Sequence, residues 1–241
     1  MSHLAHKFLA LYSFTFGRCF FSILRGFGNF AILIAMESKS ADLKKLQKLV
    51  LDIQAVKRNH NIPGSSRHEN VLEHSMSVAM MCWKVYEDLK PSLNLEKILK
   101  YCLVHDYLER GLEKDVNTYA PEQERQLKKQ REAEMLVVLK SEFDDFSSMT
   151  KTVEDYENMT DIEARFVWCV DKMQGLILGD IDGWRPYKRI GVTYEQFCDK
   201  GDMFMSKCPD FLQETLKQLN EYTRGTFYDQ PTENIKGSNP D

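Results

Sequence analysis

The segment LEKILKYCLVHDYLE, residues 95–109, joins a helical apolar pattern to side chains that bind metals. Its apolar residues recur at the spacing of one helix face, which predicts a helix over Leu95–Leu108. These residues are Ile98, Leu99, Cys102 and Leu103. Glu109 lies four positions after His105 and three after Asp106, so we expect all three to project toward one side of this helix. Imidazole and carboxylate bind divalent transition metals, so the segment predicts two ligands and one acid or base.

Helical spacing of apolar residues recurs on both sides of this segment. It predicts helices over Ala41–Arg58, Asn70–Leu89, Asp161–Leu178, Thr193–Met205 and Pro209–Tyr222. Glu122–Glu142 is heavily charged with one apolar edge, and the acidic, polar residues 144–160 are expected to form an exposed connection. No sustained alternating pattern, internal repeat or Gly-rich phosphate loop occurs. The fold prediction is therefore all-α, a compact multi-helix bundle with the metal site between helices.

The two ends of the chain differ in composition from its middle. Residues 1–35 are rich in Phe, Leu and Ile and hold no acidic residue. They suit a transit peptide, a secretory signal, or translation from upstream of a functional start at Met36. Basic residues interrupt their apolar runs before the ~18 residues of a membrane span are reached. We expect residues 36–223 to form one domain and the polar residues 224–241 to be disordered.

Charge and cysteine usage exclude some classes of function. The chain has 32 basic and 36 acidic residues, a formal charge of −4, and a sequence pI near 5.9. Such a balance does not favour general binding to nucleic acid phosphates. The six cysteines form no CxxC pair and several lie in apolar helical stretches, so we expect reduced, buried thiols and a cytoplasmic protein, or an organellar one if residues 1–35 are a transit peptide.

Two further residues could complete a ligand set. His74 lies near the start of one predicted helix, and Asp171 lies on the apolar face of another, where an unpaired carboxylate would be costly to bury. Taken alone, a His-Asp dipeptide is more often a surface pair, and Asp171 beside Lys172 could be a surface ion pair. The ordered set of His74, His105-Asp106 and Asp171 on three predicted helices favours the metal site.

Three stretches resemble the HD-domain superfamily, and within it the 5′-deoxynucleotidase-like branch. They are RHENVLEHS (residues 67–75), LVHDYLE (residues 103–109) and ARFVWCVDK (residues 164–172). They match that branch's R-x-E-N/S-V-x-E-H-S, HD-x-x-E and A-x-F-V-x-x-x-D signatures. The resemblance covers roughly residues 41–180.

The resemblance implies a role for each matched residue. The implied metal ligands are His74, His105, Asp106 and Asp171, and Glu109 would orient or deprotonate the attacking water. Arg58 matches the family's phosphate-binding residue, although the Trp that usually follows it is missing. Arg67 fits the branch motif, either anchoring its loop through a carboxylate or meeting phosphate. The usual Gly-Asp pair is replaced by GLEKD (residues 111–115), so Asp115 is the candidate for that aspartate.

The implied activity is hydrolysis of (deoxy)nucleoside 5′-monophosphates to nucleoside and phosphate. The cofactor would be one divalent ion, Co²⁺, Mn²⁺, Mg²⁺ or Zn²⁺, and the family implies a homodimer. Two alternatives remain open. The same site could act on nucleoside triphosphates, cyclic nucleotides or another phosphoester, or the chain could be a catalytically silent helical protein that binds a metal or a nucleotide.

Overall fold

The computed structural model describes residues 39–112 and 116–229, which fall into two units, one ending at Leu51 and one starting at Asp52. The first unit is helical from residue 39, and this helix ends at residue 54. The prediction that it reaches Arg58 is wrong. The apolar spacing continues to Val56, but the chain turns there, and the Val56 amide donates to the Ile53 carbonyl. The proposed extension 1–35 lies outside the described residues.

A short hairpin follows this helix. Strands β1 (Lys57–Asn61) and β2 (His68–Asn70) pair antiparallel with an irregularity between Lys57 and Asn61. The turn between them contains Gly64 at φ +76°, a conformation that glycine adopts at little cost. No strand was predicted, because strands this short show no alternating pattern. They are the only strands within residues 39–112 and 116–229, and the all-α prediction is confirmed.

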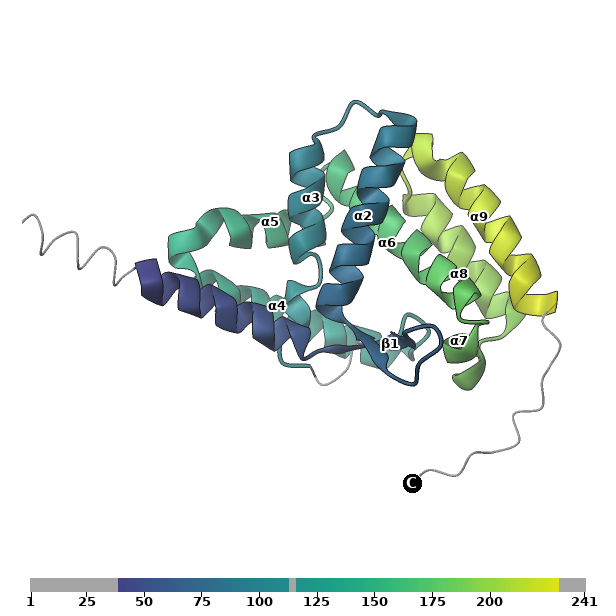
Figure 1. Ribbon diagram of the computed structural model, residues 1–241, viewed down its shortest axis with the longest axis horizontal. Coiled ribbons are helices and arrows are strands. Elements are labelled where there is room, and N and C mark those ends of the chain that lie inside the picture. Colours follow the sequence, from purple (N-terminus) through teal and green to yellow (C-terminus); the bar gives the residue numbers. More distant parts are fainter. Residues whose placement is uncertain (1–38, 113–115, 230–241) are drawn as a thin grey trace, which may run out of the picture. The chain divides into compact units, whose positions relative to one another are not determined.

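The second unit is built from helices around α6 (Figure 1). They are α2 (Val71–Leu89), α3 (Leu95–Val104), α4 (Glu122–Glu142), α5 (Ser147–Glu157), α6 (Ile162–Ile181), α7 (Arg185–Arg189), α8 (Tyr194–Lys207) and α9 (Asp210–Asp229). Helix α6 contacts α2, α3, α5, α8 and α9. Its predicted apolar face of Phe166, Val167 and Val170 is fully buried, and each such side chain contributes roughly 1.5–3 kcal/mol. Among the described helices, none is both long and apolar enough to cross a membrane.

Helix α5 replaces the exposed connection that was predicted for residues 144–160. Met149, Val153 and Tyr156 are buried on one face of this helix, at spacings of four and three. The prediction was wrong because acidic and polar residues outnumber these three apolar ones in the segment. Helix α5 matters for the site because the Tyr156 ring lies edge-on to His105, at 5.7 Å between ring centroids.

The C-terminal helix is longer than predicted. Helix α9 continues to Asp229, so residues 224–229 are helical and do not belong to a disordered tail. Arg224 explains part of the difference, because its guanidinium donates to Asp202 on α8 at 2.7 Å. The polar composition of residues 224–229 does not indicate this contact between α8 and α9. The remaining tail residues, 230–241, lie outside the described residues.

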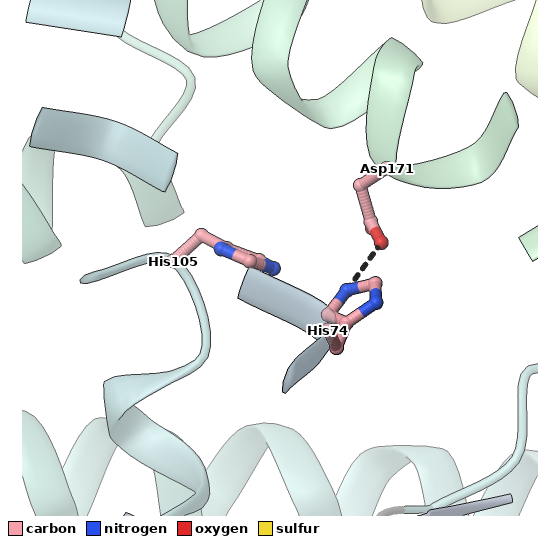
Figure 2. A group of neighbouring side chains, drawn as sticks. All are labelled: His74, His105 and Asp171. Carbon is pink, nitrogen blue, oxygen red and sulfur yellow. Dashed lines mark ion pairs between the residues drawn. The ribbon is translucent and has the colours of Figure 1, made fainter. Parts of the chain in front are cut away.

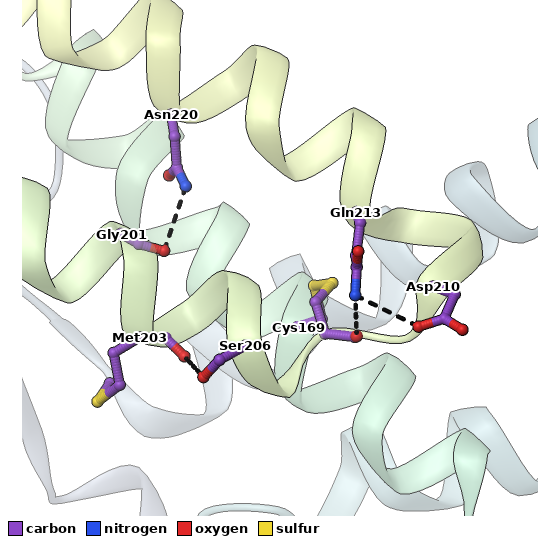
Figure 3. Close-up of a disulfide and its surroundings, with 8 residues drawn as sticks. Cys169, Gly201, Met203, Ser206, Asp210, Gln213 and Asn220 are labelled. Atoms are coloured by element: carbon purple, nitrogen blue, oxygen red, sulfur yellow. Dashed lines mark hydrogen bonds between the residues drawn. A yellow bond between two sulfur atoms is a disulfide. The ribbon is translucent and has the colours of Figure 1, made fainter.

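A disulfide joins Cys169 on α6 to Cys208, which precedes α9 (Figure 3). The expectation that all six cysteines are reduced thiols is therefore corrected for these two. No sequence pattern indicated this pair, since the two cysteines are 39 residues apart. Cys82 and Cys102 are free and buried, in agreement with the prediction.

Candidate metal centre

His74 is positioned by the first turn of α2. Asn70 caps the helix by accepting from the Glu73 amide at 3.0 Å, and the Glu73 carboxylate accepts from the Asn70 amide at 3.0 Å. This reciprocal cap fixes where the helix begins, and hence which side of α2 His74 occupies. The His74 side chain is fully buried. A buried imidazole at this place needs a partner, and the neighbouring elements supply it.

Arg67 lies beside this cap and not in the cluster. Its guanidinium makes two hydrogen bonds of 2.9 Å to the Glu73 carboxylate, and its side chain is 57% exposed. Of the two roles predicted for Arg67, this contact matches the anchoring of the loop through a carboxylate.

The prediction that His105, Asp106 and Glu109 share one helix is wrong. Helix α3 ends at Val104, His105 caps it, and Tyr107–Glu109 form a single 3₁₀ turn. The His105 side chain is nevertheless buried, and its Nδ1 lies 2.9 Å from the Cys102 carbonyl. A carbonyl accepts only from a protonated nitrogen, so this bond leaves the lone pair on Nε2.

Asp171 completes the group from α6, and the three side chains point toward one another in Figure 2. Its Oδ1 lies 2.9 Å from His74 Nε2, and its Oδ2 accepts from Lys172 Nζ at 2.6 Å. The ion pair with Lys172 that was considered as a surface alternative does form. The carboxylate is buried all the same, at 6% exposure for the residue.

The geometry of the cluster fits a single cation. One ligand atom each from His74, His105 and Asp171 lie within 4.8 Å of one another. Asp106 Oδ2 lies 3.4 Å from His105 Nε2 and 3.8 Å from His74 Nε2. A divalent ion with bonds of about 2.1 Å spaces its ligand atoms about 3 to 4 Å apart. His105 Nε2 is buried without a hydrogen-bond partner among the described residues, as expected for a ligand atom.

Electrostatics keep the imidazole neutral and the aspartate ionised. Burial, and then the charge of Arg58, lower the pKa of His74 to about 4. Burial alone would raise the pKa of Asp106, but the electrostatic interactions with His105, Arg58 and His74 outweigh it, so that this pKa lies below its usual value. Both groups are therefore in the protonation state that a metal requires at neutral pH.

Arg58 belongs to the site, although it lies on β1 and not on the predicted helix. Its Nη1 donates to Asp106 Oδ2 at 2.6 Å, and its Nε lies 3.8 Å from Glu69 Oε2. Glu69 was not predicted to take part. It is buried on β2, 3.8 Å from His74 Nδ1, and burial raises its pKa to about 7. A carboxyl beside the second nitrogen of a histidine can orient the ring.

Glu109 is buried near the cluster and meets a lysine that the sequence did not single out. Its backbone amide donates to the Asp106 carbonyl at 3.1 Å, and its Oε1 accepts from Lys128 Nζ at 2.6 Å. Lys128 comes from α4, where it is one of many charged residues, so no sequence signal distinguished it. The candidate Asp115 lies within residues 113–115, outside the described residues.

A pocket of about 660 Å³, including open space at its mouth, borders the cluster. Its lining includes Arg58, His60, Tyr119, Asp171, Gly175 and Tyr187. Asp171 lines the pocket and belongs to the cluster, so the pocket adjoins the candidate metal position. Charged groups thus lie beside the aromatic rings of His60, Tyr119 and Tyr187.

The sequence also identifies the family. Residues 50–211 match the sequence model of the HD domain family, and this match covers well over half of the chain. The chain therefore belongs to the HD domain family. None of the curated proteins matches it.

Solved structures share the fold at low sequence identity. A predicted metal-dependent phosphohydrolase from Magnetospirillum magnetotacticum MS-1 matches with a TM-score of 0.64 and 21% identity, over 78% of this chain and 96% of that one. The PH0347 protein from Pyrococcus horikoshii OT3 gives 0.53 and 22%, over 74% and 98%. A conserved hypothetical protein from Pyrococcus furiosus gives 0.51 and 22%, over 72% and 98%. These identities show a common fold, and function has to be argued from the site.

Proposed function

We propose that the protein is a metal-dependent phosphohydrolase that converts (deoxy)nucleoside 5′-monophosphates to nucleoside and phosphate. The observation that carries the proposal is the convergence of two buried imidazoles and two carboxylates from three separate segments, with Arg58 beside them. Membership of the HD domain family supports it, and so does the fold shared with a protein described as a predicted metal-dependent phosphohydrolase. The nucleotidase specificity is carried by the motif resemblance to the 5′-deoxynucleotidase-like branch.

In this proposal His74, His105, Asp106 and Asp171 hold one divalent ion. When bound, such an ion polarises a phosphoryl oxygen and lowers the pKa of a coordinated water toward neutrality. Arg58 stabilises the negative charge that develops on the phosphoryl oxygens. Glu109 accepts the proton of the attacking water, and Lys128 holds the Glu109 carboxylate in place at 2.6 Å. The phosphorus–oxygen bond to the nucleoside breaks, and the nucleoside oxygen takes up a proton.

Phosphate release from metal-stripped protein tests this function. Co²⁺, Mn²⁺, Mg²⁺ or Zn²⁺ would be added in turn, with 5′-monophosphates, triphosphates and cyclic nucleotides as substrates. We expect phosphate from the monophosphates and none from a His105→Ala variant purified in the same way, which controls for contaminating phosphatase. Chromatography would identify the nucleotide products as well, because hydrolysis of a cyclic nucleotide gives a monophosphate and no free phosphate. Turnover of triphosphates or cyclic nucleotides alone would assign the second activity. A retained metal with no turnover of any substrate would favour the silent binding protein.

We also propose a homodimer, as the family resemblance implies. Helix α2 supports it because Met76, Met80 and Trp83 follow one another at spacings of four and three with 64, 53 and 48% exposure. Large exposed apolar side chains in such a row are typical of contact surfaces. Light scattering should give twice the chain mass, and Met80→Lys should shift it to the single-chain mass. A monomeric wild-type protein would contradict the proposal.

A further inference from the structure

Two glycines of α6 lie one turn apart and have different surroundings. At Gly179, a Cβ atom would approach the rings of Trp184 and Tyr187 to 2.7 and 2.8 Å. Close packing therefore requires glycine at that position. At Gly175, the described residues place a single atom from outside the α6 backbone and the adjoining positions within 4 Å of an added Cβ. This atom is His60 Cε1, at 3.9 Å, which is an ordinary contact. Packing of the described residues does not explain Gly175, although glycine weakens a helix interior.

Gly175 faces the pocket that borders the metal cluster. It is four residues after Asp171, so the two share one face of α6, and both line the pocket. The Gly175 carbonyl accepts from the Tyr187 hydroxyl at 3.3 Å. Tyr187 in turn has the ring of His60 at 5.6 Å and the ring of Tyr119 at 5.8 Å, between ring centroids. The missing side chain of Gly175 thus leaves space beside three aromatic rings.

The pocket changes in chemical character from one part to another. Arg58, Asp171 and Lys172 supply charge at the part that adjoins the candidate metal position. His60, Tyr119 and Tyr187 supply flat, largely apolar surface. A ligand that carries a phosphate and a flat ring matches both parts, because rings pack favourably against aromatic side chains. A small phosphoester without a ring would use only the charged part.

We propose that Gly175 sets the size of the substrate group that the pocket accepts, and that this group is a flat ring such as a nucleobase. The proposal rests on the proposed phosphohydrolase function for its substrate. Because position 175 has no side chain, the side of the pocket formed by α6 is not filled. The ring occupies the space beside Gly175 and Tyr187. A larger residue at position 175 fills this space while the metal cluster keeps its ligands.

Two substrates that differ only in the base test the proposal. We would compare kcat/KM for 2′-deoxyadenosine 5′-monophosphate and for 2-deoxyribose 5-phosphate in the wild type and in Gly175→Leu. In Gly175→Leu, kcat/KM should fall at least tenfold for the nucleotide and less than threefold for the sugar phosphate. Equal losses on both substrates, or no loss on the nucleotide, would overturn the size limit. Metal content would be measured in each sample.

Gly225→Leu is the matched control. It makes the same change on a helix, α9, at a position that does not line the pocket and where an added Cβ meets none of the described residues within 4 Å. This variant should leave both values of kcat/KM unchanged. If it lowers them as much as Gly175→Leu does, the effect comes from glycine replacement in a helix and the proposal fails.

A binding measurement separates this proposal from the proposed function. Ligand-observed NMR would detect 2′-deoxyadenosine, which has no phosphate, on metal-stripped wild type and Gly175→Leu. Binding to the wild type and its loss in the variant support the ring pocket even if no phosphomonoester is hydrolysed. Equal binding to both proteins, or no binding to the wild type, would overturn it.

Discussion

His105 shows how a single hydrogen bond prepares a ligand. Its Nδ1 is held by the Cys102 carbonyl at 2.9 Å, so the ring cannot turn without losing that bond, and Nε2 is directed at Asp106 and His74. His74 is prepared in another way, because burial keeps its ring uncharged. A fixed His105 ring and a neutral His74 ring both lower the cost of binding a cation.

Asp106 is the carboxylate on which Arg58 and both imidazoles converge. Asp106→Ala should reduce bound metal from about one ion per chain to below about 0.1, and lower kcat/KM roughly a thousandfold or more. Elemental analysis and phosphate release would measure the two effects. Asp88→Ala is a suitable control, because Asp88 pairs with Lys84 on the exposed side of α2. Normal metal content with normal activity in Asp106→Ala would remove Asp106 from the site.

Glu109 should behave differently from the ligands. Glu109→Gln keeps the size of the side chain and an oxygen for Lys128, but removes the proton acceptor. Metal content should stay near one ion per chain while kcat falls about 10²- to 10⁴-fold, as for loss of a general base. If the variant loses its metal instead, Glu109 is a ligand.

For individual residues of the site, the sequence predicted the types of ligand better than it predicted the contacts around them. His74, His105 and Asp171 were expected to meet, and the structure brings them within 4.8 Å. Lys128 and Glu69 were missed. Lys128 does not differ by residue type or spacing from the charged residues around it on α4. Glu69 does belong to the matched R-x-E-N/S stretch, but no role was assigned to it there.

Helix α6 carries Asp171, and substitutions of its glycines Gly175 and Gly179 would test how the helix packs. Gly179→Ala should destabilise the protein by about 1–3 kcal/mol, because its Cβ would lie 2.7 Å from the Trp184 ring. Gly175→Ala should be neutral or stabilising by up to about 1 kcal/mol, because among the described residues packed against α6 the added methyl meets only His60, at 3.9 Å. Denaturant unfolding of the metal-free protein measures both. Equal effects of the two substitutions would contradict this account of α6.

Asp161 links the start of α6 to α3 in a way that depends on pH. Partial burial would raise the pKa of Asp161, but hydrogen bonds from Lys97 and Tyr101 outweigh it and lower the pKa to about 2. A carboxyl with a lowered pKa in the folded state stabilises the protein above its unfolded pKa, near 4. This contribution is lost as the pH falls through about 2.

Asp161→Asn isolates this charge, because asparagine caps a helix about as well as aspartate. The variant should be less stable by about 1 kcal/mol at pH 7, a value reduced for partial exposure, and the difference should shrink toward zero between pH 4 and pH 2. Urea unfolding at several pH values measures it. A difference that is constant across this range would show that the charge of Asp161 does not contribute.

Helix positions were predicted well and helix ends less well. The start of α2 agrees with the sequence because its cap and its apolar face are local features. The end of α3 was missed, since its apolar pattern continues into the 3₁₀ turn at Tyr107–Glu109. Helix α5 was missed because acidic and polar residues outnumber the three apolar residues that mark its buried face.

In the second unit as a whole, the fold gathers the residues of the candidate metal site from separate elements. It brings the start of α2, the end of α3 and the middle of α6 to one place, while β1 and α4 add Arg58 and Lys128. The resemblance to the HD-domain superfamily predicted this gathering. Neither the hairpin that carries Arg58 nor the Cys169–Cys208 disulfide could be predicted, because both depend on pairing between residues without a local pattern.

Metal stoichiometry tests the central claim most directly. Metal-stripped wild type and the His74→Ala, His105→Ala and Asp171→Ala variants would be dialysed against Co²⁺, checked for helical content by circular dichroism, and analysed for cobalt. We predict about one ion per chain in the wild type and less than about 0.1 in each folded variant. Full cobalt occupancy in the folded variants, or none in the wild type, would contradict the claim that these imidazoles and carboxylates bind one cation.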